Sequence, residues 1–246
     1  MTGCQISWSF AREADFSRAG LSGARLFKSL LSRAKLSRAD LTEANLERVV
    51  LNEAELTGII LRKTELRKVL LRECQLPGFD FSNTRFLQVQ ADGANLEGAD
   101  FTGSDLSMSN FSRANLNRAA FRDAKAKSCM FPAAQLVRAD LSGCNLQQSN
   151  LRQVTATEAR FSKALLVHCL FQKADLSAAV VQGAACQHAD FSHATIQGAD
   201  FSRANLYRAR MHRARDEHAD FSGAFTEMMQ GTDKELEEAE NWEPSV

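Results

Sequence analysis

The sequence predicts an all-β solenoid, and three observations lead to this fold class. Every fifth residue from Phe16 to Phe221 is apolar, with one exception, and most are Leu or Phe. The residue two places before each of these centres is never charged, and 26 of these 42 residues are Ala. Glycine recurs two places after the centre. A phase that holds without a slip along most of the chain indicates a repeat architecture.

The central positions show why the chain must turn once per repeat. They hold 22 Leu and 12 Phe, and only Asp216 is polar. In an α-helix, which turns about 100° per residue, side chains five residues apart would spiral around the helix and could not share one buried face. In a continuous β-strand, a five-residue step is odd and would place successive central residues on opposite faces of the sheet. Four repeats therefore form a square coil of 20 residues, with the central and small residues inside. The pattern offers no account of Asp216.

The corners and the phenylalanines agree with a square coil. The segment Leu76-Pro77-Gly78-Phe79 is typical of a type II turn, whose third residue has a positive φ. Six central Phe residues fall on one wall and four on the opposite wall, so we expect their rings to meet across the bore.

Three segments, at residues 39–46, 94–101 and 199–206, resemble the A(D/N)LxX pattern of pentapeptide repeat proteins. The resemblance covers roughly residues 14–224 and implies a right-handed quadrilateral β-helix. At about 4.8 Å per coil, about ten coils make a rod about 50 Å long.

The predicted organisation has three parts. Residues 1–13 form an N-terminal cap or first partial coil in which Trp8 and Phe10 cover the bore, and residues 14–224 form the β-helix. Residues 225–246 form a C-terminal cap with a short helix and an acidic tail, because Thr232 and Glu235 resemble a capping box. Its apolar residues either plug the last coil or form a dimer contact; they are Phe225, Met228, Met229, Leu236 and Trp242. A solvated cap without a partner is the alternative.

Charge and composition narrow the possible partners. The 30 basic and 30 acidic residues cancel, but residues 1–231 carry a net charge of +5 and residues 232–246 a net charge of −5. No leader-like run and no long apolar run is present, so we expect a cytoplasmic protein without a membrane span.

Cysteines and histidines carry no strong metal signal. All six cysteines occupy inward positions and none forms a CxxC pair, so we expect buried thiols rather than a disulfide or a metal site. The five histidines are expected to point outward. His168 and His188 should stack about 4.8 Å apart beside Arg208, as a solvated ladder or, less favoured, as a metal pair.

The sequence favours a non-catalytic protein-binding or scaffold module. It has no phosphate loop, no nucleophile elbow and no insertion that would build a concave site, so we predict no catalytic residue, no cofactor and no metal. A flat wall of stacked rungs is suited to binding a protein partner.

Two surface ladders are candidates for partner binding. The position before the centre carries Asp or Asn in the family but is apolar on one wall, and this stripe forms the candidate partner surface: Leu30, Val50, Leu70, Met130 and Leu170. Local packing without a partner is the alternative, and Ile60 and Val180 depart similarly on another wall. Lys28, Arg48 and Lys68 form a candidate basic ladder for nucleic acid, but five Glu residues are interleaved with it in the sequence and surface aromatic residues are few, which favours a mixed-sign solvated wall over nucleic-acid binding.

The resemblance implies two further possibilities. Some family members mimic duplex DNA and modulate DNA gyrase, but a 50 Å duplex carries about 30 phosphate charges, whereas this rod is mildly positive. The run from Ala199 to Trp242 resembles the end of pentapeptide repeat proteins associated with type VI secretion, which implies an accessory or adaptor role. A homodimer through an end of the rod or through the apolar stripe stays open, and the sequence does not name the partner.

Overall fold

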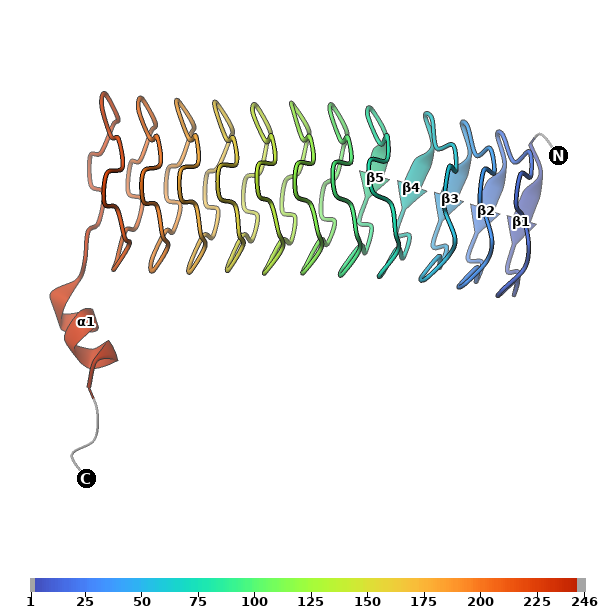
Figure 1. The fold of residues 1–246 in the computed structure, drawn as a ribbon, viewed down its shortest axis with the longest axis horizontal. Coiled ribbons are helices and arrows are strands. Elements are labelled where there is room, and N and C mark those ends of the chain that lie inside the picture. Colours follow the sequence, from blue (N-terminus) through green and yellow to red (C-terminus); the bar gives the residue numbers. More distant parts are fainter. Residues whose placement is uncertain (1–2, 243–246) are drawn as a thin grey trace.

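The fold is a right-handed quadrilateral β-helix, shown by a computed structural model that describes residues 3–242 (Figure 1). Parallel bridges join residues that are 20 positions apart, from Gln5 and Arg25 at the first coil to Arg210 and Gln230 at the last. This confirms the square coil predicted from the five-residue period.

Five short strands form the only sheet of the described chain in which consecutive residues pair, along one wall of the first coils (Figure 1). They are parallel, lie in the order of the sequence, and are β1 (Gln5–Ser7), β2 (Arg25–Phe27), β3 (Asn45–Glu47), β4 (Glu65–Arg67) and β5 (Arg85–Leu87). Other repeats contribute single bridged residues. Because every pairing joins residue i to i+20, identical repeat positions stack into straight ladders along the rod.

The bore is filled by central Leu and Phe side chains and lined by the small residues. Phe81, Phe101 and Phe121 stack on one wall, with ring centroids 5.0 and 4.9 Å apart. The ring of Phe111 on the opposite wall meets Phe101 edge to face at 5.8 Å. These four rings are fully buried, so the predicted aromatic packing across the bore is confirmed.

Each corner places one residue in the left-handed region, two positions after the centre. Glycine occupies this position at several corners, for example Gly78 with φ of 65°, but charged residues adopt it too, including Lys28 at 47° and Arg138 at 58°. This conformation costs a non-glycine residue roughly 1–2 kcal/mol. Backbone hydrogen bonds hold it: Arg138 N–H donates to Thr157 O at 3.0 Å, and Ala139 N–H donates to Leu136 O, also at 3.0 Å.

Aspartates at the position before the centre support the corner that follows. The Asp80 carboxylate accepts a 2.9 Å hydrogen bond from the backbone N–H of Ser82. Hydrogen bonding to Ser82 lowers the pKa of Asp80, although partial burial opposes this. The Asp or Asn of the repeat pattern is therefore a local turn-stabilising residue.

The cysteines are free thiols, and all except half-buried Cys4 are buried. Cys74 and Cys129 donate to the backbone oxygens of Leu51 and Leu106 in the preceding coil, at 3.1 and 3.0 Å. Burial raises the pKa of Cys74 to about 11 and that of Cys129 to about 12. Both therefore remain protonated near neutral pH and act as small core residues.

The predicted C-terminal helix is present as α1 (Lys234–Glu240), but its cap is not the predicted one. Asp233 is the N-cap and accepts from the backbone N–H groups of Glu235 and Leu236 at 3.0 and 3.2 Å. The Thr232 hydroxyl instead accepts a 3.2 Å hydrogen bond from Arg213 N–H. This bond ties the segment before α1 to the preceding coil.

The predicted plug is wrong, because α1 lies outside the outline of the coils rather than across the bore (Figure 1). Of its five proposed residues only Met229 is half-buried; the exposed ones are Phe225, Met228, Leu236 and Trp242. Asp216 is exposed because the residue 20 positions later lies in α1, so no coil covers it. At the other end, Trp8 and Phe10 are 65% and 85% exposed and do not cover the first coil.

Truncating a ring in the middle of the bore should be far more costly than truncating one at its end. We expect Phe121→Ala to lower the free energy of unfolding by about 3–5 kcal/mol, because a fully buried ring leaves a cavity. Half-buried Phe221 on the same wall is the control, and Phe221→Ala should cost less. Urea unfolding measures both, and equal costs would contradict the assignment of the core.

Candidate functional site

The candidate basic ladder and the start of the apolar stripe lie on the same corner of the rod. Lys28, Arg48 and Lys68 follow directly after β2, β3 and β4. Two residues further on, bridges join Leu30 to Val50 and Val50 to Leu70. We call these six residues the N-terminal strip. Three cations and three apolar side chains thus run side by side over three successive coils.

The apolar side of the strip is continuous only in the first coils. Bridges extend it to Phe10 before Leu30, whereas Gln90 follows Leu70. Leu30, Val50 and Leu70 are half-buried because they stack on one another. Sequence reasoning assigned Phe10 to the cap, although its position 20 residues before Leu30 was a sufficient signal.

The structure separates the other two stripe residues from the N-terminal strip. Met130 and Leu170 lie on the same ladder, but Asn110 precedes Met130 and Asn150 stands between the two. Met130 is 40% exposed and Leu170 is half-buried.

The cations of the strip have no carboxylate partner within residues 3–242, at a limit of 4.0 Å. Lys28 instead places its ammonium 4.0 Å from the centroid of the Trp8 ring.

Three of the five interleaved glutamates pair with cations on other ladders. The pairs are Glu43 with Lys63 at 3.5 Å, Glu53 with Arg33 at 3.1 Å, and Glu65 with Arg85. Glu47, which directly precedes Arg48, and Glu73 form no ion pair among residues 3–242.

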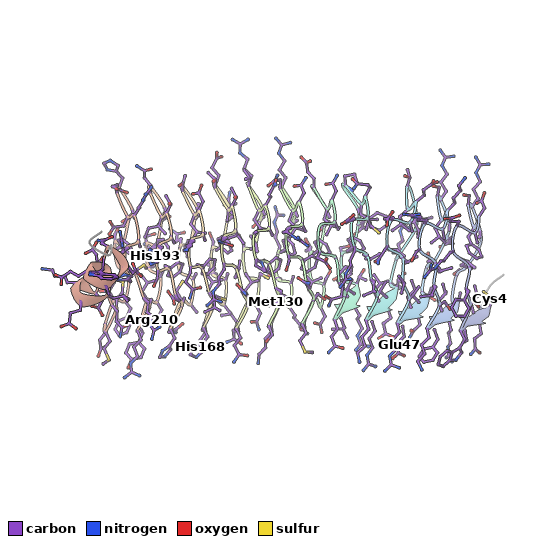
Figure 2. All side chains as sticks on the ribbon, turned by 90° about the horizontal axis from the view of Figure 1, so that it is seen from below. Cys4, Glu47, Met130, His168, His193 and Arg210 are labelled. Carbon is purple, nitrogen blue, oxygen red and sulfur yellow. The ribbon has the colours of Figure 1, made fainter. Side chains whose placement is uncertain are left out.

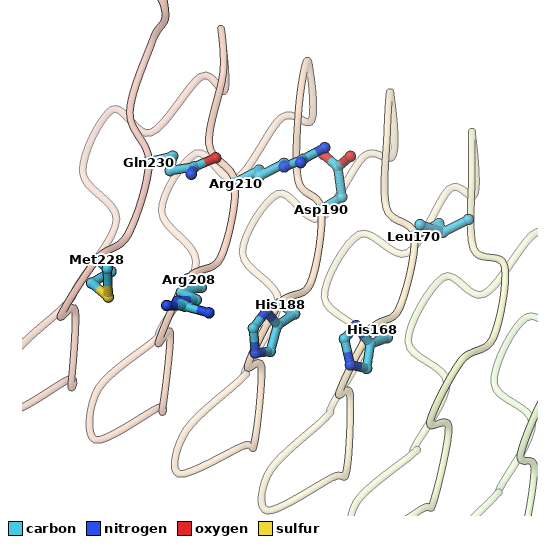
Figure 3. Close-up of a pocket in the computed structure, with 8 residues that line it drawn as sticks. All are labelled: His168, Leu170, His188, Asp190, Arg208, Arg210, Met228 and Gln230. Atoms are coloured by element: carbon cyan, nitrogen blue, oxygen red, sulfur yellow. The ribbon is translucent and has the colours of Figure 1, made fainter.

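The same corner carries a second polar cluster toward the C-terminus. His168, His188 and Arg208 lie on the same ladder as the cations of the strip, and Asp190 and Arg210 lie on the same ladder as its apolar residues. Together these five residues line a pocket of about 540 Å³ (Figure 3). The rings of His168 and His188 stack with centroids 4.8 Å apart, which confirms the predicted ladder.

A third cluster holds α1 against the wall of the last coils. Glu240 accepts from Arg213 Nη1 at 3.1 Å and lies 3.3 Å from His193 Nε2 and 3.4 Å from His212 Nε2. We call these four residues the clasp; Figure 2 shows α1 at this end of the rod, near His193 and Arg210. Removal from water acts to raise the pKa of Glu240, but its hydrogen bonds to Arg213 and His212 outweigh this and lower it.

His212 departs from the expectation that every histidine is exposed. It points away from the bore, but the segment that returns along the wall buries it. Asp233 N–H donates to His212 Nδ1 at 3.1 Å, so the proton of the neutral ring lies on Nε2 and faces Glu240.

His193, His212 and Glu240 place three potential metal-ligand atoms within 4.8 Å of one another. A metal ion, however, needs the Nε2 lone pair that the His212 tautomer does not offer. The arrangement fits a hydrogen-bonded anchor for α1 better than a metal centre.

Comparison with family models matches almost the whole coil region. The model of pentapeptide repeats (8 copies) matches residues 29–67, 64–103, 174–213 and 184–223. The model described as a pentapeptide repeat region matches residues 104–179. The search of curated proteins gave no match.

Solved structures of repeat proteins resemble the chain at low identity. HetL of the cyanobacterium Nostoc sp. strain PCC 7120, involved in heterocyst differentiation regulation, is 27% identical, with 92% of this chain and 87% of HetL covered and a TM-score of 0.35. A trypsin-treated variant of QnrB1, a plasmid-mediated fluoroquinolone resistance protein, is 18% identical, with coverages of 98% and 100% and a TM-score of 0.33.

A pentapeptide repeat protein of the Arabidopsis thaliana thylakoid lumen is 27% identical, with 53% of this chain and 67% of that protein covered and a TM-score of 0.14. All three TM-scores are below 0.5. Among residues 3–242, no helix has the length and apolar character needed to cross a membrane.

Removing the clasp carboxylate should release α1 without affecting the coils. We expect Glu240→Ala to speed amide hydrogen exchange of residues 235–240 by about tenfold at pH 7, because the charge-assisted hydrogen bonds that hold α1 to the last coils are lost. Glu238→Ala, which removes an exposed carboxylate of the same helix, is the control and should change exchange little. Mass spectrometry of the exchanged peptides measures both, and equal protection in the two variants would argue against the clasp.

Proposed function

Since the chain belongs to the pentapeptide repeat family, we propose that it is a non-catalytic protein-binding or scaffold module whose docking surface is the N-terminal strip. One observation carries the proposal: three cations without a carboxylate partner run beside three stacked apolar side chains on consecutive coils.

The strip combines the two contributions that a docking surface needs. Its apolar side supplies burial energy, and its unpaired cations can select an acidic partner without first breaking an ion pair. The coils already hold both ladders in place, so little conformational entropy is lost on binding. The partner that fits is a protein segment with adjacent rows of acidic and apolar side chains.

The same features favour protein over nucleic acid. Three cations neutralise about three phosphates, whereas proteins that depend on phosphate contacts commonly make 6–10 of them. The apolar half of the strip would also remain unused against a phosphate backbone. The proposal includes a pathway, in which the protein is a cytoplasmic accessory or adaptor of type VI secretion. This part of the proposal rests on the resemblance of residues 199–242 to the end of secretion-associated repeat proteins. Finding type VI secretion genes beside the gene for this chain would support it.

Aspartate substitutions on the strip should abolish partner capture. We expect the triple variant Leu30→Asp, Val50→Asp, Leu70→Asp to lose a partner that the wild-type protein retains in pull-downs from its source cells. The coils should tolerate the change, because Asp occupies the same repeat position at Asp80 and Asp140.

The control is the triple variant Ile60→Asp, Leu165→Asp, Val180→Asp, which changes the same repeat position on other walls. It should retain the partner, identified by mass spectrometry. Recovery of identical proteins with all three baits would sink the assignment of the strip.

Gyrase modulation is the alternative function, and we expect the protein not to perform it. Its coil region is mildly positive, so it presents the opposite charge to a duplex mimic. A supercoiling assay with purified gyrase and excess protein, with and without a quinolone, should show neither inhibition nor protection. A dose-dependent effect of either kind would restore this alternative.

A further inference from the structure

We propose that a gap between two coils, on the wall opposite the N-terminal strip, binds an extended peptide segment of a partner protein. The main chain of the peptide pairs with backbone groups that the gap leaves unpaired, and an apolar side chain of the peptide fills a cavity beside Phe79. The proposed function concerns the strip alone, so the gap is a second binding site that goes beyond it. Figure 1 shows the place: the coils that lead into β4 and β5 stand further apart than other neighbouring coils.

Main-chain hydrogen bonds between neighbouring coils are missing at this gap. One coil earlier, Leu41 N–H donates to Ile60 O at 2.8 Å. The equivalent bond from Leu61 N–H to Asp80 O is absent among residues 3–242, and so is the bond from Asp80 N–H to Ile59 O. The rims of the gap therefore carry main-chain donors and acceptors without a main-chain partner.

The gap is a local slot in a continuous rod. Within the described chain, Ile60 and Asp80 form no bridge with each other, but each keeps its bridge to the coil on its other side. Val50 is bridged to Leu70 before the gap, and β4 pairs with β5 after it. The two coils are therefore held together at both ends of the slot, so its rims stay in place.

Two bulky side chains explain why the coils separate here. Of the eleven residues from Ala19 to Ala219 at steps of 20, nine are Ala, and the other two are consecutive on the ladder: Ile59 and Phe79. The Phe79 ring packs on Phe81, with ring centroids 4.7 Å apart. Two large side chains in place of two methyl groups overpack a ladder whose rungs lie about 4.8 Å apart, and the coils move apart.

The gap contains a cavity of about 430 Å³ whose lining includes Ile60, Leu61 and Phe79. Leu61 is 7% exposed, whereas Leu41 and Phe81 on the same ladder are 1% and 0% exposed, so the cavity reaches the edge of the core. Phe79 is only half-buried. An apolar side chain that entered the cavity would remove these apolar groups from water.

A peptide main chain supplies what the rims lack. One peptide residue donates its N–H to Ile59 O and accepts from Leu61 N–H with its C=O. Ile60 makes this same pair of bonds with the preceding coil, so the geometry is that of the β-helix itself. A small apolar molecule would fill the cavity but would leave these main-chain groups unpaired. The gap therefore fits an extended peptide better than a small apolar molecule.

Charge at the gap indicates which peptide fits. Arg62 lines the cavity, is exposed, and has no carboxylate within 4.0 Å among residues 3–242. The Asp80 carboxylate on the other rim is engaged by Ser82 N–H. The Arg62 guanidinium is thus available to an acidic residue that lies beside the apolar residue of the peptide.

Restoring the alanine ladder tests the cause of the gap. In the variant Ile59→Ala, Phe79→Ala the coils should close and the missing bonds should form. We expect amide exchange of Leu61 and Asp80, followed by NMR, to slow at least about tenfold relative to the wild-type protein. Unchanged exchange at both amides would overturn the assignment of these side chains as the cause.

The matched control is Val49→Ala, Val69→Ala, which truncates two consecutive buried residues at the same repeat position on the opposite wall. The bonds between coils are intact there; for example, Leu70 N–H donates to Val49 O at 2.9 Å. This variant should not slow exchange at the gap, and thermal unfolding checks that both variants are folded.

A phage-displayed library of random octapeptides is the probe for binding. Selection on the wild-type protein should enrich peptides with an apolar residue beside an acidic one. A synthetic copy should bind the Ile59→Ala, Phe79→Ala variant at least about tenfold more weakly than the wild-type protein, and the Val49→Ala, Val69→Ala control with unchanged affinity. Failure to obtain any peptide that depends on the open gap would overturn the proposal.

An N-methyl scan of that peptide tests the main-chain pairing with the wild-type protein and needs no variant. Methylation of the nitrogen that donates to Ile59 O should weaken binding at least about tenfold, although every side chain is unchanged. Methylation at the first residue of the peptide, outside the slot, is the control. Equal affinity at every methylated position would overturn the pairing.

The strip and the gap are tested by different variants. The triple Asp variant at Leu30, Val50 and Leu70 should bind the selected peptide as the wild-type protein does, because the gap lies on the opposite wall. Loss of the peptide from this variant would assign it to the strip and would overturn the second site.

Discussion

The structure depends on one backbone constraint, the left-handed residue two places after every centre. Each such residue turns the chain, and four turns bring it back onto the preceding coil, where its N–H and C=O groups find partners 20 residues away. Without this corner the central Leu and Phe residues could not share one bore. The local cost of the left-handed conformation is offset by the parallel hydrogen bonds and by the burial that they make possible.

Because the coils are in strict register, surface chemistry is organised along ladders and not along the sequence. Lys28, Arg48 and Lys68 are distant in sequence and adjacent in space, whereas Glu43 and Glu53 turn toward other ladders. A linear count of charges therefore describes this protein poorly. The relevant neighbours of a surface residue are those 20 positions before and after it.

The position of a residue within the five-residue repeat determines whether its side chain points into the bore or outward. This position was enough to predict the coil period, the facing phenylalanines, the buried cysteines and the stacked rings of His168 and His188. The errors lie where the chain leaves the register. Thr232 and Asp233 are both good caps, and the bond from Arg213 to Thr232 decides between them. His212 is buried by residues beyond the repeats, and the sequence does not show the path of α1 outside the coils.

The polar centres of the final coil have a consequence for assembly. Asp216 and Thr226 occupy central positions, which elsewhere hold apolar residues, mostly Leu or Phe, and both are exposed. Stacking another rod on this end would enclose a carboxylate in an apolar channel, with a penalty of several kcal/mol for an unpaired charge. The last layer therefore acts as a terminator that prevents copies from joining into a continuous fibre through this end.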